Sequence, residues 1–364
     1  MAQTEIDVPR SHGPHISTST GFGRFGEKRE LRTYQAHQLE DEVSQKWRAQ
    51  FIISDEKFVR SLFNNNFQNS WQDAVPVWQQ TIEAIQQRDI EKAEQLVRSM
   101  YAMFETEITR INMAAIHLEK HNPKSALNVL EYSGDMAKQN WEFYLNKALA
   151  RMDLKDYQLA LMELNNVASL QDSNVKVAFC FAKIYQYLGY YYKAGEYLKL
   201  TSKLAPSYSP GWYMLGMIQS KLGELQDAYT SFEQAQKISP NQYSLWYNKG
   251  NVLLRLTKYE SAVACYKQSL RLNPGYAMAW NNMGIALNYV GRSFEALQSF
   301  RKALSFNPRL YEAHLNCGLI FETMGKRQKA LEYYHRFLQI APNNFQKQKE
   351  IVNSRIGALQ RKNQ

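Results

Sequence analysis

The residue patterns that could support a cofactor site occur near the start of the chain. Gly21, Gly23 and Gly26 spell G-x-G-x-x-G, the pattern of a turn that binds a dinucleotide. Such a turn must follow an apolar strand and open the helix of a βαβ unit, and no apolar strand precedes these glycines. We therefore interpret the glycines as part of a tail and expect no nucleotide or other cofactor.

Histidine and cysteine spacing gives no signature of catalysis or metal binding. His12 and His15 stand close together but have no further residues of ligand type nearby. No serine, cysteine or carboxylate accompanies a histidine at a spacing that indicates nucleophilic or acid-base catalysis. The sequence therefore predicts no catalytic residue, no metal site and no enzymatic activity. Three cysteines without metal-ligand spacing indicate free thiols in a reducing compartment: Cys180, Cys265 and Cys317.

A spacing of 34 residues organises the C-terminal half of the chain. Each block opens with tryptophan or histidine, carries a glycine and then an alanine at fixed distances, and closes with proline. A glycine on one helix facing an alanine on the next lets two backbones approach closely, while an aromatic residue fills the gap to the following unit. The proline ends the second helix because it has no backbone N–H to donate. The predicted packing residues are Trp212, Gly216, Ala228, Pro240, Trp246, Gly250, Ala262, Pro274, Trp280, Gly284, Ala296, Pro308, Gly318, Ala330 and Pro342.

This register, W-x-x-L-G followed by A-x-x-x-F and a closing proline, resembles the tetratricopeptide repeat, a helix-turn-helix unit of 34 residues. The resemblance implies an all-α protein, a right-handed α-solenoid in which neighbouring repeats bury each other's apolar faces. Weaker copies of the register extend back to about residue 74. We therefore expect seven to eight repeats over residues 74–342, with the best matches at 209–342.

The two ends of the chain have a different composition. Residues 343–364 are expected to form a basic capping helix and tail, because Ile351, Val352 and Ile356 fall at helical spacing among charged residues. Residues 1–72 are expected to form a partly extended N-terminal arm with short helices. The sequence leaves open whether this arm docks on its own solenoid or on a neighbour.

In tetratricopeptide repeats the first helix of each pair lines the concave face, so the resemblance implies a peptide-binding groove. Two residues before each packing glycine lie Asn248, Asn282 and Asn316. An amide can pair with a peptide backbone whatever its side chains, and the row resembles the asparagine ladder of O-linked N-acetylglucosamine transferase repeats. Asparagine is also frequent at this position in the family, so both interpretations stay open. The candidate groove residues are Asn146, Tyr213, Met217, Tyr247, Asn248, Asn251, Asn281, Asn282, Ile285, Asn288, Asn316 and Leu319.

The same positions argue against binding of an acidic chaperone tail. The carboxylate clamp of chaperone-adaptor repeats combines asparagines with lysines and an arginine. Here the cation positions hold Tyr247 and Glu312, and Glu312 would repel a carboxylate. The groove lining instead favours an apolar or neutral segment.

Charge distribution and hydropathy bound the remaining functions. Of the net charge of +10, much lies in residues 326–364, where nine basic residues face two acidic ones. A basic end can bind RNA, but the period differs from that of RNA-reading pentatricopeptide arrays, which argues against nucleic acid. No apolar run approaches the roughly 18 residues that a membrane span requires. An intracellular, reducing compartment is expected, with the cytoplasm or cilium favoured and mitochondria without a cleaved presequence left open.

The sequence therefore predicts a non-catalytic scaffold or adaptor within a large multi-subunit assembly, ciliary or organellar in setting. Its expected partners are other protein subunits or extended peptide segments. One alternative is a peptide or substrate adaptor that uses the asparagine row. The other is an RNA-associated assembly factor that uses the basic C-terminal end. The sequence identifies neither the partner nor the organelle.

Overall fold

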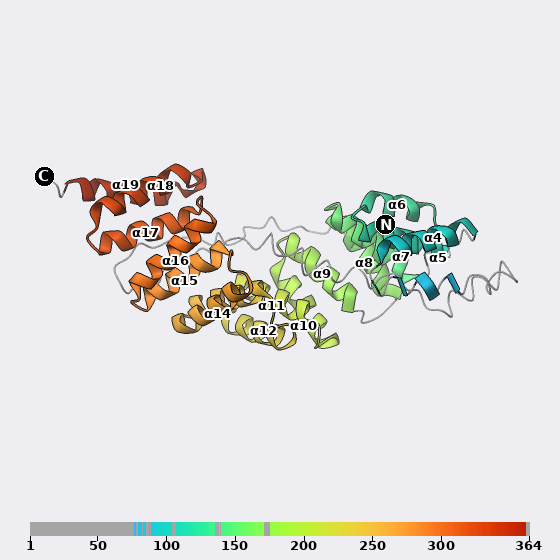
Figure 1. Cartoon of the computed structure of the whole chain (residues 1–364). Coiled ribbons are helices and arrows are strands. Elements are labelled where there is room, and N and C mark those ends of the chain that lie inside the picture. The colour runs from blue at the N-terminus through green and yellow to red at the C-terminus, as the bar shows by residue number, and fades with distance from the viewer. Residues whose placement is uncertain are drawn as a thin grey trace, which may run out of the picture. The chain divides into compact units, whose positions relative to one another are not determined.

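The computed structural model describes residues 76–77, 79–81, 83–84, 87, 89–103, 107–134, 138, 140–170 and 175–361. The predicted N-terminal arm and residues 362–364 lie outside this part of the chain. Within it the secondary structure is helical and contains no β-strand (Figure 1). The predicted all-α class is confirmed. The described helices belong to two compact units, one up to Leu256 and one from Thr257.

The N-terminal unit is a succession of short helices, each packed against the next along the chain (Figure 1). They have the lengths and the order that a series of helix-turn-helix repeats requires. Their bounds are α4 Ile90–Met103, α5 Glu107–Glu119, α6 Pro123–Glu131, α7 Trp141–Asp153, α8 Tyr157–Leu170, α9 Val175–Tyr187, α10 Tyr191–Leu204, α11 Ser209–Leu222, α12 Leu225–Ile238 and α13 Tyr243–Arg255.

The C-terminal unit has the same alternation and ends in a helix that packs on the last pair (Figure 1). Each of its second helices stops two residues before a proline of the predicted register. The bounds are α14 Tyr259–Leu272, α15 Ala277–Tyr289, α16 Ser293–Phe306, α17 Tyr311–Thr323, α18 Arg327–Ile340, the 3-10 turn η3 Asn343–Phe345 and α19 Gln346–Arg361. α19 lies where the sequence predicts the capping helix, and it buries Val352 and Ile356.

The packing glycines make room for aromatic rings. A Cβ on Gly216 would lie 2.9 Å from the ring of Phe232, and one on Gly284 would lie 2.7 Å from Phe300. These distances are shorter than a carbon–carbon contact allows. The close neighbour of Gly216, Gly284 and Gly318 is therefore the aromatic ring of the same repeat, whereas the sequence suggests an alanine. All four register alanines are fully buried: Ala228, Ala262, Ala296 and Ala330.

The residue that opens each block is held by a hydrogen bond from its ring. Trp246 Nε1 donates to the carbonyl oxygen of Pro240 at 2.7 Å, and Trp212 and Trp280 make the same bond to the prolines six residues before them, at 2.9 and 2.8 Å. His314 Nε2 lies 3.0 Å from the carbonyl oxygen of Pro308. The bond ties the first helix of one repeat to the chain that leaves the previous one.

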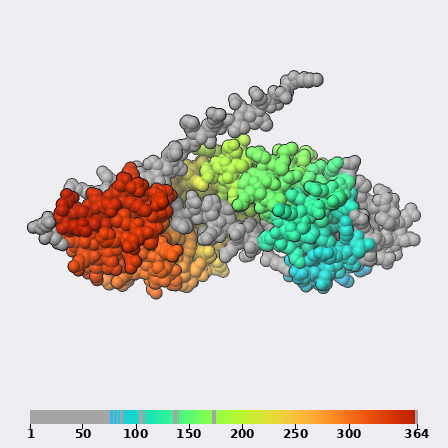
Figure 2. Space-filling view, turned by 90° about the horizontal axis from the view of Figure 1, so that it is seen from above, coloured from blue at the N-terminus to red at the C-terminus, as the bar shows by residue number. Residues whose placement is uncertain are grey.

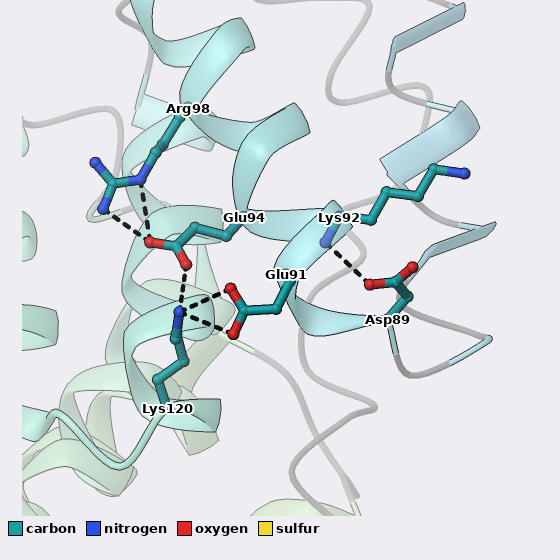
Figure 3. Close-up of polar contacts among 6 residues, drawn as sticks. All are labelled: Asp89, Glu91, Lys92, Glu94, Arg98 and Lys120. Carbon is teal, nitrogen blue, oxygen red and sulfur yellow. Dashed lines mark hydrogen bonds and ion pairs between the residues drawn. The ribbon is translucent and has the colours of Figure 1, made fainter.

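Ion pairs reinforce the junction between α4 and α5 (Figure 3). Glu94 accepts hydrogen bonds from Arg98, its neighbour one turn along α4, and from Lys120 Nζ at 2.5 Å. Lys120, which directly follows α5, also contacts Glu91 at 3.2 Å. Pairing with Lys120 and then with Arg98 lowers the pKa of Glu94 below its ordinary value.

Candidate functional site: the asparagine row of the first helices

The predicted site residues all lie on first helices of the repeats, namely α7, α11, α13, α15 and α17. The structure divides them into two groups by exposure. Half-buried residues, which a partner can reach in part, are Met217, Asn248, Ile285, Asn288, Asn316 and Leu319. Buried residues are Asn146, Tyr213, Tyr247, Asn251, Asn281 and Asn282.

The row asparagines join successive first helices through a repeated hydrogen bond. Asn248 Nδ2 donates to the hydroxyl of Tyr213 at 2.7 Å, which links α13 to α11. Asn316 Nδ2 donates to Asn281 Oδ1 at 3.2 Å and links α17 to α15. Asn146 Nδ2 donates to the carbonyl oxygen of Ile111 at 3.3 Å and links α7 to α5. Donor and acceptor lie 35 residues apart in each case, so the amide N–H serves the contact between repeats.

In the C-terminal unit this bond is part of a short chain of amides. Asn281 accepts from Asn316 and donates from its own Nδ2 to Asn282 Oδ1 at 3.1 Å. Asn281 and Asn282 are each only 3% exposed, so a ligand cannot reach them without moving a helix. A buried amide pair of this kind fixes the relative positions of its helices, because breaking one bond leaves a desolvated polar atom.

The reachable part of the row in the C-terminal unit is uncharged. Ile285 and Asn288 on α15 and Asn316 and Leu319 on α17 are half-buried. Asn288 Oδ1 accepts a hydrogen bond from Ser293 at 3.1 Å. Asn316 uses its N–H toward Asn281, which leaves its amide oxygen as the group able to accept from a partner's main-chain N–H. This surface can therefore bind an apolar or neutral segment and has no group suited to bond making or breaking.

Asn112 belongs to the same row, although it is not among the groove residues predicted from the sequence. It lies on α5, 34 residues before Asn146, and is 2% exposed. The amide oxygens of Asn112 and Asn146 are both buried without a protein hydrogen-bond partner. Stepping the register back by 34 residues from Asn146 would have found Asn112. Its burial could not be predicted in this way, because it depends on packing between helices.

The cysteines and histidines do not assemble into a reactive site within the described ranges. Burial raises the pKa of the Cys180 and Cys317 thiols to about 12, so neither is a thiolate at neutral pH. No group of three or more metal-ligating side chains occurs among the described residues. His12 and His15 and the glycine-rich segment lie outside them. Nor does that part of the chain contain a helix long and apolar enough to cross a membrane.

The basic C-terminal end is partly engaged in packing. Arg355 on α19 donates to Glu322 of α17 at 2.9 Å, and the hydroxyl of Tyr334 on α18 donates to the same carboxylate. Lys347 and Arg361 on α19 are exposed. Arg355 therefore helps to attach α19. RNA binding by the exposed basic residues stays a prediction.

Comparison with known proteins places this geometry in a family. Models of the tetratricopeptide repeat match residues 209–242, 243–276, 265–298 and 313–348. Together with the helix pairs and their register, these matches identify the chain as a tetratricopeptide repeat protein. The predicted resemblance is confirmed. The repeats support a protein of the protein-interaction scaffold class. No curated protein matches the chain.

Several solved structures resemble the chain to different extents. The C-terminal part of a repeat-containing protein from Cytophaga hutchinsonii is 14% identical with a TM-score of 0.55, covering 64% of this chain and 96% of that chain. A MamA fragment from Desulfovibrio magneticus RS-1 is 22% identical with a TM-score of 0.45, covering 47% and 96%. YrrB, described as having an unusual peptide-binding site, is 20% identical with a TM-score of 0.46, covering 49% and 92%. The first of these likenesses shows the fold alone.

Proposed function

We propose that the protein is a non-catalytic scaffold that holds a partner protein on the first-helix surface of α15 and α17, within a multi-subunit assembly. The observation that carries the proposal is the half-buried, uncharged surface of Ile285, Asn288, Asn316 and Leu319. Asn316 is held by its bond to Asn281 of the preceding repeat and Asn288 by its bond to Ser293 of the same repeat, so binding requires little ordering of these side chains. An apolar or neutral partner segment would cover the aliphatic groups and donate a main-chain N–H to Asn316.

Affinity co-purification with one surface variant and one control variant tests this proposal. Ile285→Lys places a charge in the centre of the surface, and Gln298→Lys adds the same charge to the exposed face of α16. The tagged full chain is expected to co-purify a defined set of subunits in its wild-type and Gln298→Lys forms. Ile285→Lys should lose those subunits while keeping its helical circular-dichroism spectrum. Equal recovery with all three forms would exclude this surface as the docking site.

The asparagine row also supports a peptide adaptor as the second candidate, because Asn248 and Asn316 remain reachable. Asn248→Ala removes the half-buried amide together with its hydrogen bond to the hydroxyl of Tyr213, so Tyr213→Phe, which removes the same bond and keeps the amide, is its control. Asn282→Ala is unsuitable because it would leave the Asn281 N–H buried and unpaired. A partner lost in Asn248→Ala but kept in Tyr213→Phe favours the adaptor. The predicted ciliary or organellar setting remains a prediction, and fluorescence localisation of the tagged chain tests it.

A further inference from the structure

The outward side of α10 combines exposed apolar side chains with lysines. Tyr192 is 74% exposed, Leu200 40% and Leu204 37%. Lys199 and Lys203 follow Tyr192 at spacings of 7 and then 4 residues, and Leu200 and Leu204 follow Lys193 at the same spacings, so these exposed residues form two neighbouring lines along one side of the helix. The opposite side of α10 is buried in the core of the unit. Together these residues form the α10 face: Tyr192, Lys193, Lys199, Leu200, Lys203 and Leu204.

The α10 face belongs to a strongly basic repeat. Residues 175–204 contain five lysines and a single acidic residue, Glu196. In the described part of the chain, Lys193, Lys199 and Lys203 form no ion pair with a carboxylate. The next second helix differs, since Glu233 occupies the register position of Lys199. Figure 2 shows the segment around residue 200, coloured yellow-green, at the surface of the molecule. The face thus offers unneutralised positive charge beside apolar area.

The start of α10 is held rigidly by an aromatic cluster. The rings of Tyr185 and Tyr197 stack with their centroids 5.6 Å apart, and Lys193 Nζ lies 5.4 Å from the centroid of Tyr185. Tyr191 is covered by Lys221 Nζ at 4.3 Å. These contacts order Lys193 of the α10 face and the rings beneath it, so this lysine loses less freedom on binding.

The aromatic cluster and Glu196 argue against two other anionic ligands. Single-stranded nucleic acid binds by stacking successive bases on several free ring faces. The α10 face offers one exposed ring, Tyr192, whereas neighbouring groups already cover faces of Tyr185, Tyr191 and Tyr197. An anionic lipid surface would bring phosphates against the exposed Glu196 in the middle of the face. A polypeptide can place its carboxylates at the lysines and avoid Glu196.

We propose that the α10 face docks an acidic segment of a partner protein that also carries apolar side chains. Glutamate or aspartate side chains would pair with Lys199 and Lys203, and leucine-like side chains would cover Leu200 and Leu204. Tyr192, the most exposed of these side chains, would serve as the aromatic anchor. The lysines would chiefly accelerate encounter and select against basic partners. This site is separate from the first-helix surface of the proposed function.

Binding of a fluorescent peptide of repeated glutamate and leucine to the full chain tests the proposal. Lys199→Glu combined with Lys203→Glu is expected to weaken binding at least about fivefold, because two favourable charge contacts become repulsive. The matched control is Lys237→Glu, which changes an exposed lysine at the register position of Lys203 on α12. The control should bind as the wild type does, and Tyr192→Ala should also weaken binding.

Circular dichroism and thermal melting establish that each variant is folded before its binding is compared. Absence of saturable binding by the wild type, or equal weakening by the α12 control, would overturn the proposal. Tighter binding of poly(U) or of phosphatidylserine vesicles, abolished by the double variant, would overturn it in favour of those ligands. Ile285→Lys should leave peptide binding unchanged, so failure here is distinguishable from failure of the proposed scaffold surface.

Discussion

A ring nitrogen at the start of each repeat explains why histidine can replace tryptophan in the register. Trp246 and His314 share little in shape, yet each places a ring nitrogen within 3.0 Å of the carbonyl oxygen of the proline six residues before it. The sequence predicts the spacing of these residues and attributes it to packing alone. The hydrogen bond could not be predicted from the pattern, because its acceptor is a backbone atom whose direction depends on the preceding turn.

Trp246→Phe is expected to lower the free energy of unfolding by about 1 kcal/mol, because it removes this hydrogen bond while keeping an aromatic ring at the half-buried position. Urea denaturation followed by circular dichroism measures the change. Tyr192→Phe, at an exposed position with no such bond, serves as the control and should have no effect. An unchanged midpoint for Trp246→Phe would mean that the bond contributes nothing to stability.

The turn between the two helices of a repeat requires a left-handed residue. Glycine fills this position at Gly189, Gly223, Gly291 and Gly325. Residues with a side chain occupy it at His121, Lys155 and Thr257, the last with φ 61°. A side chain in that conformation costs about 1–2 kcal/mol, and the extra flexibility of glycine in the unfolded chain costs about 0.5–1 kcal/mol.

Thr257→Gly should therefore raise the free energy of unfolding by about 0.5–1 kcal/mol, with the strain removed and part of the gain offset by entropy. Thermal melting compares it with the wild type. The reverse change, Gly223→Thr, introduces the same strain at φ 86° and should lower the melting temperature. Stabilisation by both substitutions would contradict this account.

At the scale of the element, the close pairing of two helices depends on a glycine beneath an aromatic ring. Gly284→Ala would place a Cβ 2.7 Å from Phe300, and we expect it to lower the free energy of unfolding by about 1–3 kcal/mol. The smaller residue in Phe300→Leu should relieve the clash, so the double variant should be less destabilised than the sum of the two single ones. Strict additivity in denaturant melts would show that the two positions do not interact.

The junction of α4 and α5 gives a pH dependence with a defined sign. Pairing with Lys120 lowers the pKa of Glu94 below 4.5, so the stabilisation is present above pH 4.5 and is lost as the pH falls through the lowered pKa. Glu94→Gln should be less stable than the wild type at neutral pH and equal to it in acid. Hydrogen exchange of α4 is the suitable measurement, and a difference that persists in acid would assign the effect to packing.

The sequence predicts the position of the asparagine row but not its environment. A fixed period places Asn248, Asn282 and Asn316 on equivalent helices, and this follows from local spacing alone. Asn248 and Asn316 are half-buried and Asn282 is buried, and the bonding partners of the first two lie 35 positions away on the preceding first helix. Tyr213 offers a hydroxyl to Asn248, whereas Asn281 offers an amide to Asn316. The sequence likewise does not predict that the lysines of α10 lack an ion pair with a carboxylate, because this depends on which residues packing brings near them.

At the scale of the whole molecule, the repeat array predicts that a substitution changes the stability of its own helix and of the helices packed directly against it. Each described helix packs mainly against the helices next to it in the chain, so stability should be a sum of repeat and interface terms. α19 carries Val352 at the position where α11, α13, α15 and α17 carry glycine and α5, α7 and α9 carry alanine. The branched valine side chain leaves less space there for a further second helix, which makes α19 suited to ending the stack.

Phe300→Ala tests this local transmission, because it removes a ring that is 2% exposed from α16. We expect a loss of about 3–5 kcal/mol at the site. Hydrogen exchange resolved by peptide should show reduced protection in α15, α16 and α17, which are joined by direct packing and by the Asn316–Asn281 bond. Protection of α5 to α8 should stay at its wild-type level, because those helices belong to the other compact unit. A uniform loss of protection along the chain would instead show that the array unfolds as one cooperative body.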